Sequence, residues 1–207
     1  METLVLRRDG GVLHVTLNRP QVRNALSLAM VEDLRAALAQ AEADGGIRVI
    51  VLRGAGGHFT AGADIKDMAE ARMRLATDPE AIVKVNAAFG ELCAAYAGTG
   101  LAVVAVLEGT VMGGGFGLAC VADVAIAGTS VVFRLPEVSL GVVPAQIAPY
   151  LVERLGYGDA RRLAVTGGRV DAAAALALRL VHEVHPDEAL DAAAAAVVRQ
   201  ILQGAPG

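Results

Sequence analysis

The sequence predicts an α/β fold, because short apolar runs rich in β-branched residues alternate with longer segments of helical periodicity. Hydrophobic residues make up 55% of the 207 residues and charged residues 19%, which is too apolar for a disordered chain and allows a large core. No linker or low-complexity segment interrupts the alternation. We therefore expect one domain, and the apolar excess suggests contacts between subunits.

The first third of the chain predicts a hairpin, a helix and a buried strand in turn. Residues 4–17 hold two alternating apolar runs around the turn sequence DGG, which is typical of a β-hairpin. Residues 28–44 carry apolar side chains near helical spacing, and Ser27 suits the N-cap position. IRVIVLRG predicts a short buried strand, and the segment after it, GAGGHFTAGADIKDM, begins as a loop and becomes a helix near Asp64.

The rest of the chain continues the alternation. A helix is expected from about Pro79 to Tyr96, and a glycine run with a helix behind it follows the strand LAVVAVLEG. Further strands are expected at VADVAIA, VVF and VHEV. Further helices are expected at PAQIAPYLVERLG, at GDARRLAVTGG with a closing glycine, at VDAAAALALRL and at PDEALDAAAAAVVRQILQ.

Two glycine-bearing turns, TAGADIKDM and VMGGGFGL, stand where a strand gives way to a helix. Glycine is costly inside regular structure, so three adjacent glycines indicate that the backbone comes close to something. Two converging helix N-termini would offer unpaired N–H groups to one oxygen that gains negative charge. The alternative is that the glycines only allow tight helix–strand packing. A phosphate-binding loop is less favoured, because neither turn has such a motif in its required context.

Glu137 is the acidic residue that stands out, because it follows Pro136 directly in the largely apolar segment FRLPEVSLGVVP. Desolvation there would raise the pKa of its carboxyl toward the range useful for proton transfer. The alternative is an exposed glutamate in the first turn of a helix.

Other function classes lack their usual signals. A net charge of −4 without a basic block argues against a broad nucleic-acid surface, and the four histidines lack metal-ligand spacing. Cys93 and Cys120 lie in apolar surroundings, which predicts buried free thiols in a reducing compartment. The N-terminus lacks the apolar core of a signal peptide, and no uncharged apolar run is long enough for a membrane span. We expect a soluble cytoplasmic protein without a metal.

Taken together, these segments resemble the crotonase, or enoyl-CoA hydratase/isomerase, family. The matching stretches occur in the family's order and cover nearly the whole chain: LNRPQVRNALS, VIVLRGAGGHFTAGADIKDM, AVLEGTVMGGGFGLACVADVAIA, FRLPEVSLGVVP and ARRLAVTGGRVDAAAALALRLVHEV. The resemblance implies a spiral of repeated ββα units over about residues 1–185, with 186–207 as the start of a C-terminal helical region that is short or missing. It also implies homotrimers or hexamers and acyl-CoA thioester substrates, with no cofactor besides the coenzyme A of the substrate.

The resemblance also implies roles for individual residues. The thioester oxygen would accept hydrogen bonds from the backbone N–H groups of Ala63 and Gly114, and Glu137 would be the acid–base residue. The remaining substrate- and CoA-binding positions would be Arg23 near the entrance, Ala61, Gly62, Asp64 and Ile65 along the CoA arm, and Met68 and Gly113.

Three features depart from the family pattern. Family hydratases usually carry two glutamates, and the first of these positions is Gly117 here, whereas the second is retained as Glu137. Arg179 stands where the family usually has glycine, and the family normally continues with further helices beyond the equivalent of residue 207.

The missing glutamate leaves the reaction open. One carboxylate can still move a proton between C2 and C4 of an enoyl thioester, as family isomerases do. The glycine-rich and LGVVPAQIAPYLVERLG segments instead most resemble a branch of hydratases that act on branched, carboxylated enoyl-CoA. The alternative from another class is a catalytically weak or inactive member that binds acyl-CoA or serves as a subunit.

Overall fold

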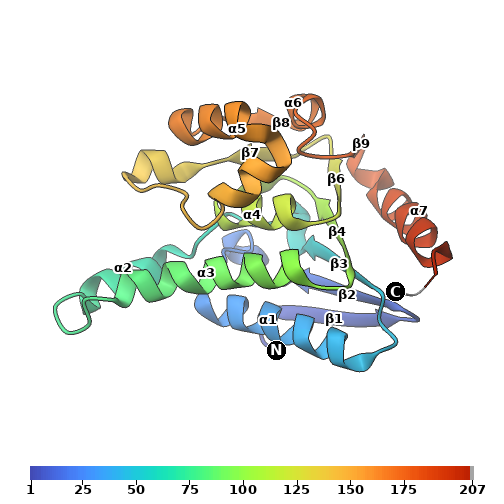
Figure 1. The fold of residues 1–207 in the computed structure, drawn as a ribbon, viewed down its shortest axis with the longest axis horizontal. Helices are drawn as coiled ribbons and strands as arrows, with labels where there is room; N and C mark the ends of the chain where they lie inside the picture. Colours follow the sequence, from blue (N-terminus) through green and yellow to red (C-terminus); the bar gives the residue numbers. More distant parts are fainter. Residues whose placement is uncertain (206–207) are drawn as a thin grey trace.

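The computed structural model describes residues 1–205. Its main sheet has six strands in the order β1-β2-β3-β4-β6-β9 (Figure 1). Only the β1–β2 pair is antiparallel; from β2 to β9 neighbouring strands run parallel. The strands of this sheet are β1 (Leu4–Asp9), β2 (Val12–Leu17), β3 (Val49–Gly54), β4 (Ala102–Leu107), β6 (Val124–Gly128) and β9 (Glu183–His185).

A second, smaller sheet has the order β5-β7-β8. It joins β5 (Thr110–Met112), β7 (Val132–Arg134) and β8 (Val170–Asp171). The β5 strand ends at the residue before the glycine run, so this sheet sets where that run begins.

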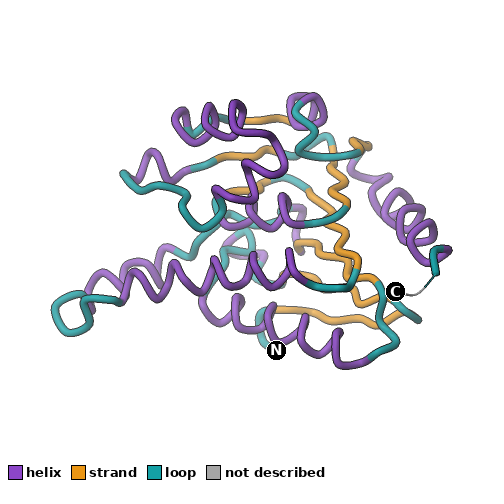
Figure 2. The backbone as a smooth tube through the Cα atoms, viewed as in Figure 1, coloured by secondary structure: helices purple, strands orange, loops and turns teal. Residues whose placement is uncertain are grey.

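Seven α-helices and four short 3-10 segments complete the described chain. The α-helices are α1 (Leu28–Asp44), α2 (Ile65–Arg74), α3 (Ala81–Gly98), α4 (Gly114–Val121), α5 (Ala148–Thr166), α6 (Ala172–Ala177) and α7 (Leu190–Gln203). The 3-10 segments are η1 (Pro20–Val22), η2 (Ala55–Gly57), η3 (Pro136–Leu140) and η4 (Asp187–Ala189). Figure 2 shows α2 and α3 as a pair that extends beyond the strands.

Helices cover both faces of the main sheet, because its central strands are apolar on both sides. Ile50 and Leu52 of β3 belong to the main core with α1, α3 and α4, whereas Val49 and Val51 face the other way. That second face packs against α7 through Leu190 and Val197 (Figure 1). The alternation of faces along one strand is the expected period of two.

Most of the expected elements are confirmed. The hairpin turns at the predicted DGG, and the Ser27 side chain accepts a hydrogen bond from Met30 N at the start of α1. The two helices expected around residue 156 are joined as α5 with a break at Gly156 (φ 75°). The small strands β5 and β8 were not predicted, since each is too short to show a periodic pattern.

Candidate functional site

The two glycine-bearing turns meet in the structure. A Cβ atom placed on Gly62 would lie 3.0 Å from Met112 O and 3.6 Å from Gly113 N, so only a glycine fits this approach without a shift. Both glycines also have positive φ, 87° at Gly62 and 50° at Gly113, which other residues adopt at a cost. The glycines therefore allow two segments about 50 residues apart in sequence to touch.

The segment 23–26 fixes the first turn from one side. Ala61 N donates to Arg23 O at 2.9 Å, Leu26 N donates to Gly62 O at 2.8 Å, and Asp64 N donates to Leu26 O at 3.0 Å. This pattern is a parallel bridge between Leu26 and Ala63. In such a bridge the N–H and C=O of Ala63 itself point away from the partner segment. Within residues 1–205, the Ala63 N–H forms no hydrogen bond to protein.

The second turn places a helix N-terminus beside the first. Gly113 is the N-cap of α4, with φ 50° and ψ −119°, and its N–H donates to Arg134 O at 3.2 Å. Gly114 is the first helical residue, and its N–H has no acceptor within the described chain. Ala63 lies one residue before Asp64, the N-cap of α2, and so stands just outside that helix.

Glu137 lies directly against this junction. A Cβ placed on Gly113 would be 3.0 Å from Glu137 Oε1, and Pro136 places the acid in the first turn of η3. Glu137 Oε2 is buried and, among residues 1–205, has no hydrogen-bond partner. Burial raises the pKa of the Glu137 carboxyl above its ordinary value of 4.5. The exposed alternative considered from the sequence is wrong for this carboxylate.

The other expected binding residues surround the first turn. Arg23 is exposed in the left-handed conformation, Ile65 is 83% exposed, and Met68 is half-buried against the main core. Asp64 is buried and structural: its side chain accepts from Lys66 N and pairs with Arg19 at 2.7 Å. Burial acts to raise the pKa of Asp64, but the hydrogen bonds from Lys66 N and Arg19 lower it below its ordinary value.

Two supporting residues were missed from the sequence. Asn24 is fully buried with φ 55°, and its amide donates to Ala55 O at 2.8 Å and His58 O at 2.7 Å. Arg19 donates to Ala25 O at 2.6 Å as well as to Asp64. Asn24 carried a signal, because asparagine tolerates the left-handed conformation better than most residues.

Gly117, the position of the missing first glutamate, has no room for a side chain. A Cβ there would overlap Ile147 Cγ2 and would lie 3.2 Å from Cys93 Sγ. Both cysteines are buried and free, as predicted, and burial raises the pKa of each thiol to about 12. Such thiols stay protonated and unreactive at neutral pH.

Two cavities lie away from the glycine junction. One, of about 690 Å³, lies at the C-terminal end of α4 and is lined in part by Tyr150, Arg154 and His182. The other, of about 210 Å³, lies on α5 between Pro144 and Ala164. Within the described residues, no cluster of His, Cys, Asp or Glu could hold a metal ion, and no helix could span a membrane.

Comparison with known proteins agrees with this arrangement. The sequence model of the enoyl-CoA hydratase/isomerase family matches residues 7–207. The probable enoyl-CoA hydratase echA8 of Mycobacterium tuberculosis is 35% identical over 203 residues, which cover 98% of this chain and 76% of the relative.

Solved structures share the fold over the whole described chain. An enoyl-CoA hydratase/isomerase from Marinobacter aquaeolei is 48% identical with a TM-score of 0.94, and the match covers 100% of this chain and 79% of that one. A putative enoyl-CoA hydratase from Thermobifida fusca in complex with acetoacetyl-CoA is 31% identical with a TM-score of 0.90, covering 98% and 81%. The chain therefore belongs to the enoyl-CoA hydratase/isomerase family.

Proposed function

We propose that this enzyme binds an acyl-CoA thioester with its carbonyl oxygen between the N–H groups of Ala63 and Gly114, and that Glu137 moves the proton. The observation that carries the proposal is Glu137 itself: its Oε2 is buried without a partner, and its Oε1 lies close against Gly113, next to Gly114. A buried carboxylate without a partner costs stability, so such a group is more often functional than structural.

The proposed step is proton transfer through an enolate. Glu137 takes the proton from C2 of a 3-enoyl thioester, and the C2–H electrons move onto the thioester oxygen. The two N–H groups stabilise that negative charge, where each donor is worth about 2.7–4 kcal/mol. Protonated Glu137 then returns the proton to C4, and the double bond moves from C3=C4 to C2=C3. The raised pKa of Glu137 suits both halves of this transfer.

The acyl group is proposed to be branched or to carry a carboxylate. The glycine-rich segment and LGVVPAQIAPYLVERLG support this choice, because they most resemble hydratases that act on branched, carboxylated enoyl-CoA. Turnover on a panel of straight, branched and carboxylated enoyl-CoA thioesters tests this part. Equal kcat/KM across the panel would contradict it.

The decisive experiment compares Glu137→Gln with the wild type. Glutamine is nearly isosteric but cannot accept the proton, so kcat should fall about 10²–10⁴-fold while acyl-CoA affinity, measured by calorimetry, stays within about twofold. Glu32→Gln, on the exposed side of α1, is the matched control and should keep full activity. Full activity of Glu137→Gln would remove its role, and a wild type that binds acyl-CoA without turnover would favour the inactive alternative.

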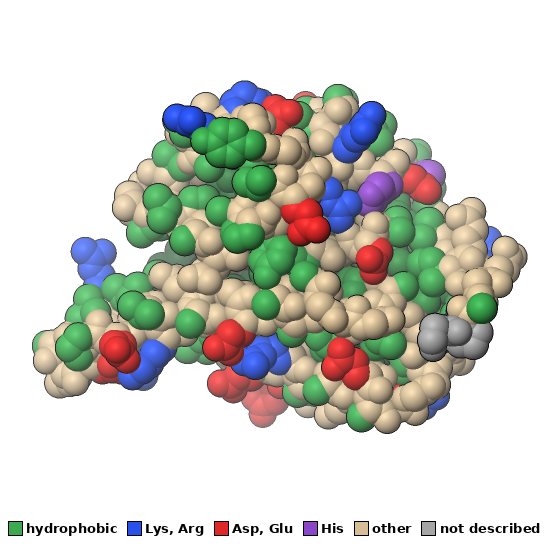
Figure 3. All heavy atoms as spheres, in the orientation of Figure 1, with side chains coloured by type: hydrophobic (Ala, Val, Ile, Leu, Met, Phe, Trp, Pro, Cys, Tyr) green, Lys and Arg blue, Asp and Glu red, His purple; other side chains and the backbone are tan. Residues whose placement is uncertain are grey.

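We further propose that the chain assembles as a trimer or a pair of trimers. Apolar side chains gather on the face around α5 (Figure 3). Leu140, Val142 and Val143, before α5, are 72%, 50% and 78% exposed. Such a contiguous apolar surface is typical of an interface. Light scattering that gives a monomer at micromolar concentration would contradict the assembly.

A further inference from the structure

Gly113, the N-cap of α4, and Gly117, within α4, each lie against a different side chain. Gly117 N donates to Gly113 O at 3.2 Å, so the two residues lie about one helical turn apart, which is roughly 6 Å along the axis. Glu137 lies against Gly113, and Ile147 lies against Gly117. The side chain against Gly117, about one turn along α4 from Glu137, is therefore the hydrocarbon side chain of Ile147.

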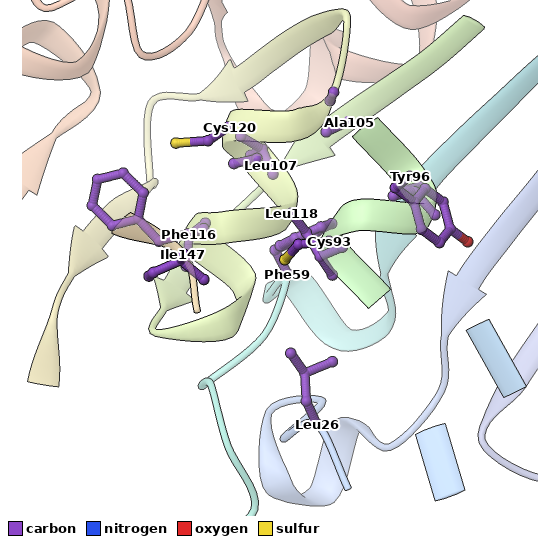
Figure 4. Packing of buried hydrophobic residues seen from close by; sticks show 14 of the residues in the cluster. Leu26, Phe59, Cys93, Tyr96, Ala105, Leu107, Phe116, Leu118, Cys120 and Ile147 are labelled. Atoms are coloured by element: carbon purple, nitrogen blue, oxygen red, sulfur yellow. The ribbon is translucent and has the colours of Figure 1, made fainter. Parts of the chain in front are cut away.

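Ile147 is held rigidly at this place. It is 2% exposed, and its backbone lies in the first turn leading into α5, where Ile147 N donates to Pro144 O and Leu151 N donates to Ile147 O. Figure 4 shows its side chain packed against α4 close to Phe116. A β-branched side chain has little freedom at χ1, so it cannot swing aside cheaply.

The contact with Gly117 involves the stiff part of that side chain. A Cβ at residue 117 would overlap Ile147 Cγ2 and lie 3.0 Å from Ile147 Cβ, closer than carbon atoms normally approach. Cys93 Sγ would lie 3.2 Å from the same Cβ at residue 117. Glycine at 117 and isoleucine at 147 are thus a dependent pair, since neither a larger residue 117 nor a carboxylate there fits while Ile147 remains.

We propose that Ile147 is the specificity-determining residue that closes the second acid position and holds the site to proton transfer by Glu137 alone. The proposal rests on the proposed function of Glu137. Addition of water to a 2-enoyl thioester breaks a water O–H bond and forms C3–O and C2–H bonds, so a second polar group that orients the water helps. Movement of the double bond within a 3-enoyl thioester needs one proton carrier and no water. An apolar Ile147 favours the second reaction.

The test is a set of variants: Gly117→Glu, Ile147→Ala and the two combined. For each variant, kcat/KM is measured for hydration of crotonyl-CoA and for isomerisation of 3-hexenoyl-CoA. The ratio of the hydration value to the isomerisation value is then compared with that of the wild type. Tm is recorded for each variant. Glu137→Gln in the wild-type background shows separately whether isomerisation depends on that carboxylate.

Gly117→Glu alone should lower Tm by roughly 5 °C without raising the ratio more than about twofold, because overpacking displaces Ile147 and its surroundings. The double variant should recover part of that Tm and raise the ratio at least about tenfold. Ile147→Ala alone opens the position without supplying an acid, so as the matched control it should leave the ratio within about twofold.

Several results would overturn the proposal. One is a tenfold higher ratio in Gly117→Glu with an unchanged Tm, since Ile147 would then not close the position. Another is a double variant that recovers Tm but keeps the wild-type ratio, or that shows no hydration at all. If Gly117→Glu does not fold, Gly117→Ala with and without Ile147→Ala repeats the Tm comparison, and additive losses there contradict the pairing. Equal isomerisation by wild type and Glu137→Gln removes the role of Glu137 only, because the ratio still reports on Ile147.

Discussion

Arg19 Nη1 donates to Asp64 Oδ2 at 2.7 Å, and Asp64 Oδ1 accepts from Lys66 N at 2.9 Å. One carboxylate therefore caps α2 and anchors the turn that carries Ala63 to the segment after β2. Both partners are largely removed from water, with side chains 22% and 9% exposed. The position of a proposed oxyanion donor thus depends on an ion pair between two segments 45 residues apart in the sequence.

Replacing Arg19 by methionine should therefore weaken both the fold and the site. It leaves the buried Asp64 charge without its partner, which we expect to cost about 2 kcal/mol of unfolding free energy in urea titrations at pH 7. Activity should fall about tenfold as Ala63 loses its fixed position. Arg35→Met breaks the exposed pair with Glu91, 47% and 58% exposed, and as the control should cost at most about 0.5 kcal/mol.

The difference in unfolding free energy between the wild type and Arg19→Met should depend on pH. The folded-state pKa of Asp64 is lowered, so the stabilisation is present above the pKa of the unfolded chain and is lost as pH falls through the folded pKa. The gap in stability between wild type and Arg19→Met should close in acid. A gap that stays constant from pH 7 to pH 3 would contradict the role given to the pair.

Gly113→Ala should disable the site with only a moderate loss of stability. The new methyl group would lie 3.0 Å from Glu137 Oε1 and 3.8 Å from Gly62 Cα, at a φ of 50° that favours glycine. We expect kcat to fall by about 10²-fold or more, because a small misplacement of reacting groups is costly. Gly45→Ala, at φ 67° with no atom within 4 Å of the new Cβ, controls for backbone strain and should leave kcat unchanged. Equal kcat in the two variants would show that the close approach at Gly113 is dispensable.

Glu137 should reduce the stability of the protein at neutral pH. Its folded-state pKa is raised by burial, so its favourable contribution is complete below the unfolded pKa and is lost as pH rises through the folded pKa. The Tm of Glu137→Gln minus that of the wild type should therefore grow as pH rises from below 4.5, and then level off above the folded pKa. Scanning calorimetry between pH 4 and pH 8 measures this difference. A Tm difference that stays constant or decreases as pH rises would mean that the Glu137 carboxylate is solvated.

Local sequence patterns were sufficient for the long elements of the fold. The hairpin, α1 with its Ser27 cap and the strand β3 follow from alternation, helical spacing and β-branched composition. The convergence of the two glycine turns was also predicted, but on family resemblance rather than on spacing, because contacts between residues 62 and 113 depend on how the strands between them are ordered.

The supporting contacts of the site could not be predicted in this way. The sequence does not reveal that Arg19 and Asp64 form an ion pair, because 45 residues separate them and the pairing depends on tertiary packing. The closure of residue 117 by Ile147 was likewise missed, because glycine at one position does not reveal which side chain fills the space. Both are properties of how distant segments pack, which periodicity cannot encode.

Arg179, which stands where the family usually has glycine, has a left-handed backbone conformation. Arg179 has φ 57° and follows α6, where Arg179 N donates to Leu176 O at 3.0 Å and Leu180 N donates to Ala175 O at 2.9 Å. These two bonds form a Schellman motif with Arg179 at the position that favours glycine. Arg179→Gly should therefore raise the unfolding free energy by about 0.5–1 kcal/mol, because the left-handed conformation strains any residue with a Cβ.

The matched control is Arg179→Ala, which removes the same charge and most of the side chain but keeps the Cβ. Urea titrations of both variants, with equal m values, separate backbone strain from the loss of the guanidinium. If strain dominates, glycine stabilises the protein relative to wild type and alanine does not. Equal midpoints for glycine and alanine would show instead that the Arg179 side chain decides the stability here, through its place on the wall of the 690 Å³ cavity beside Arg154 and His182.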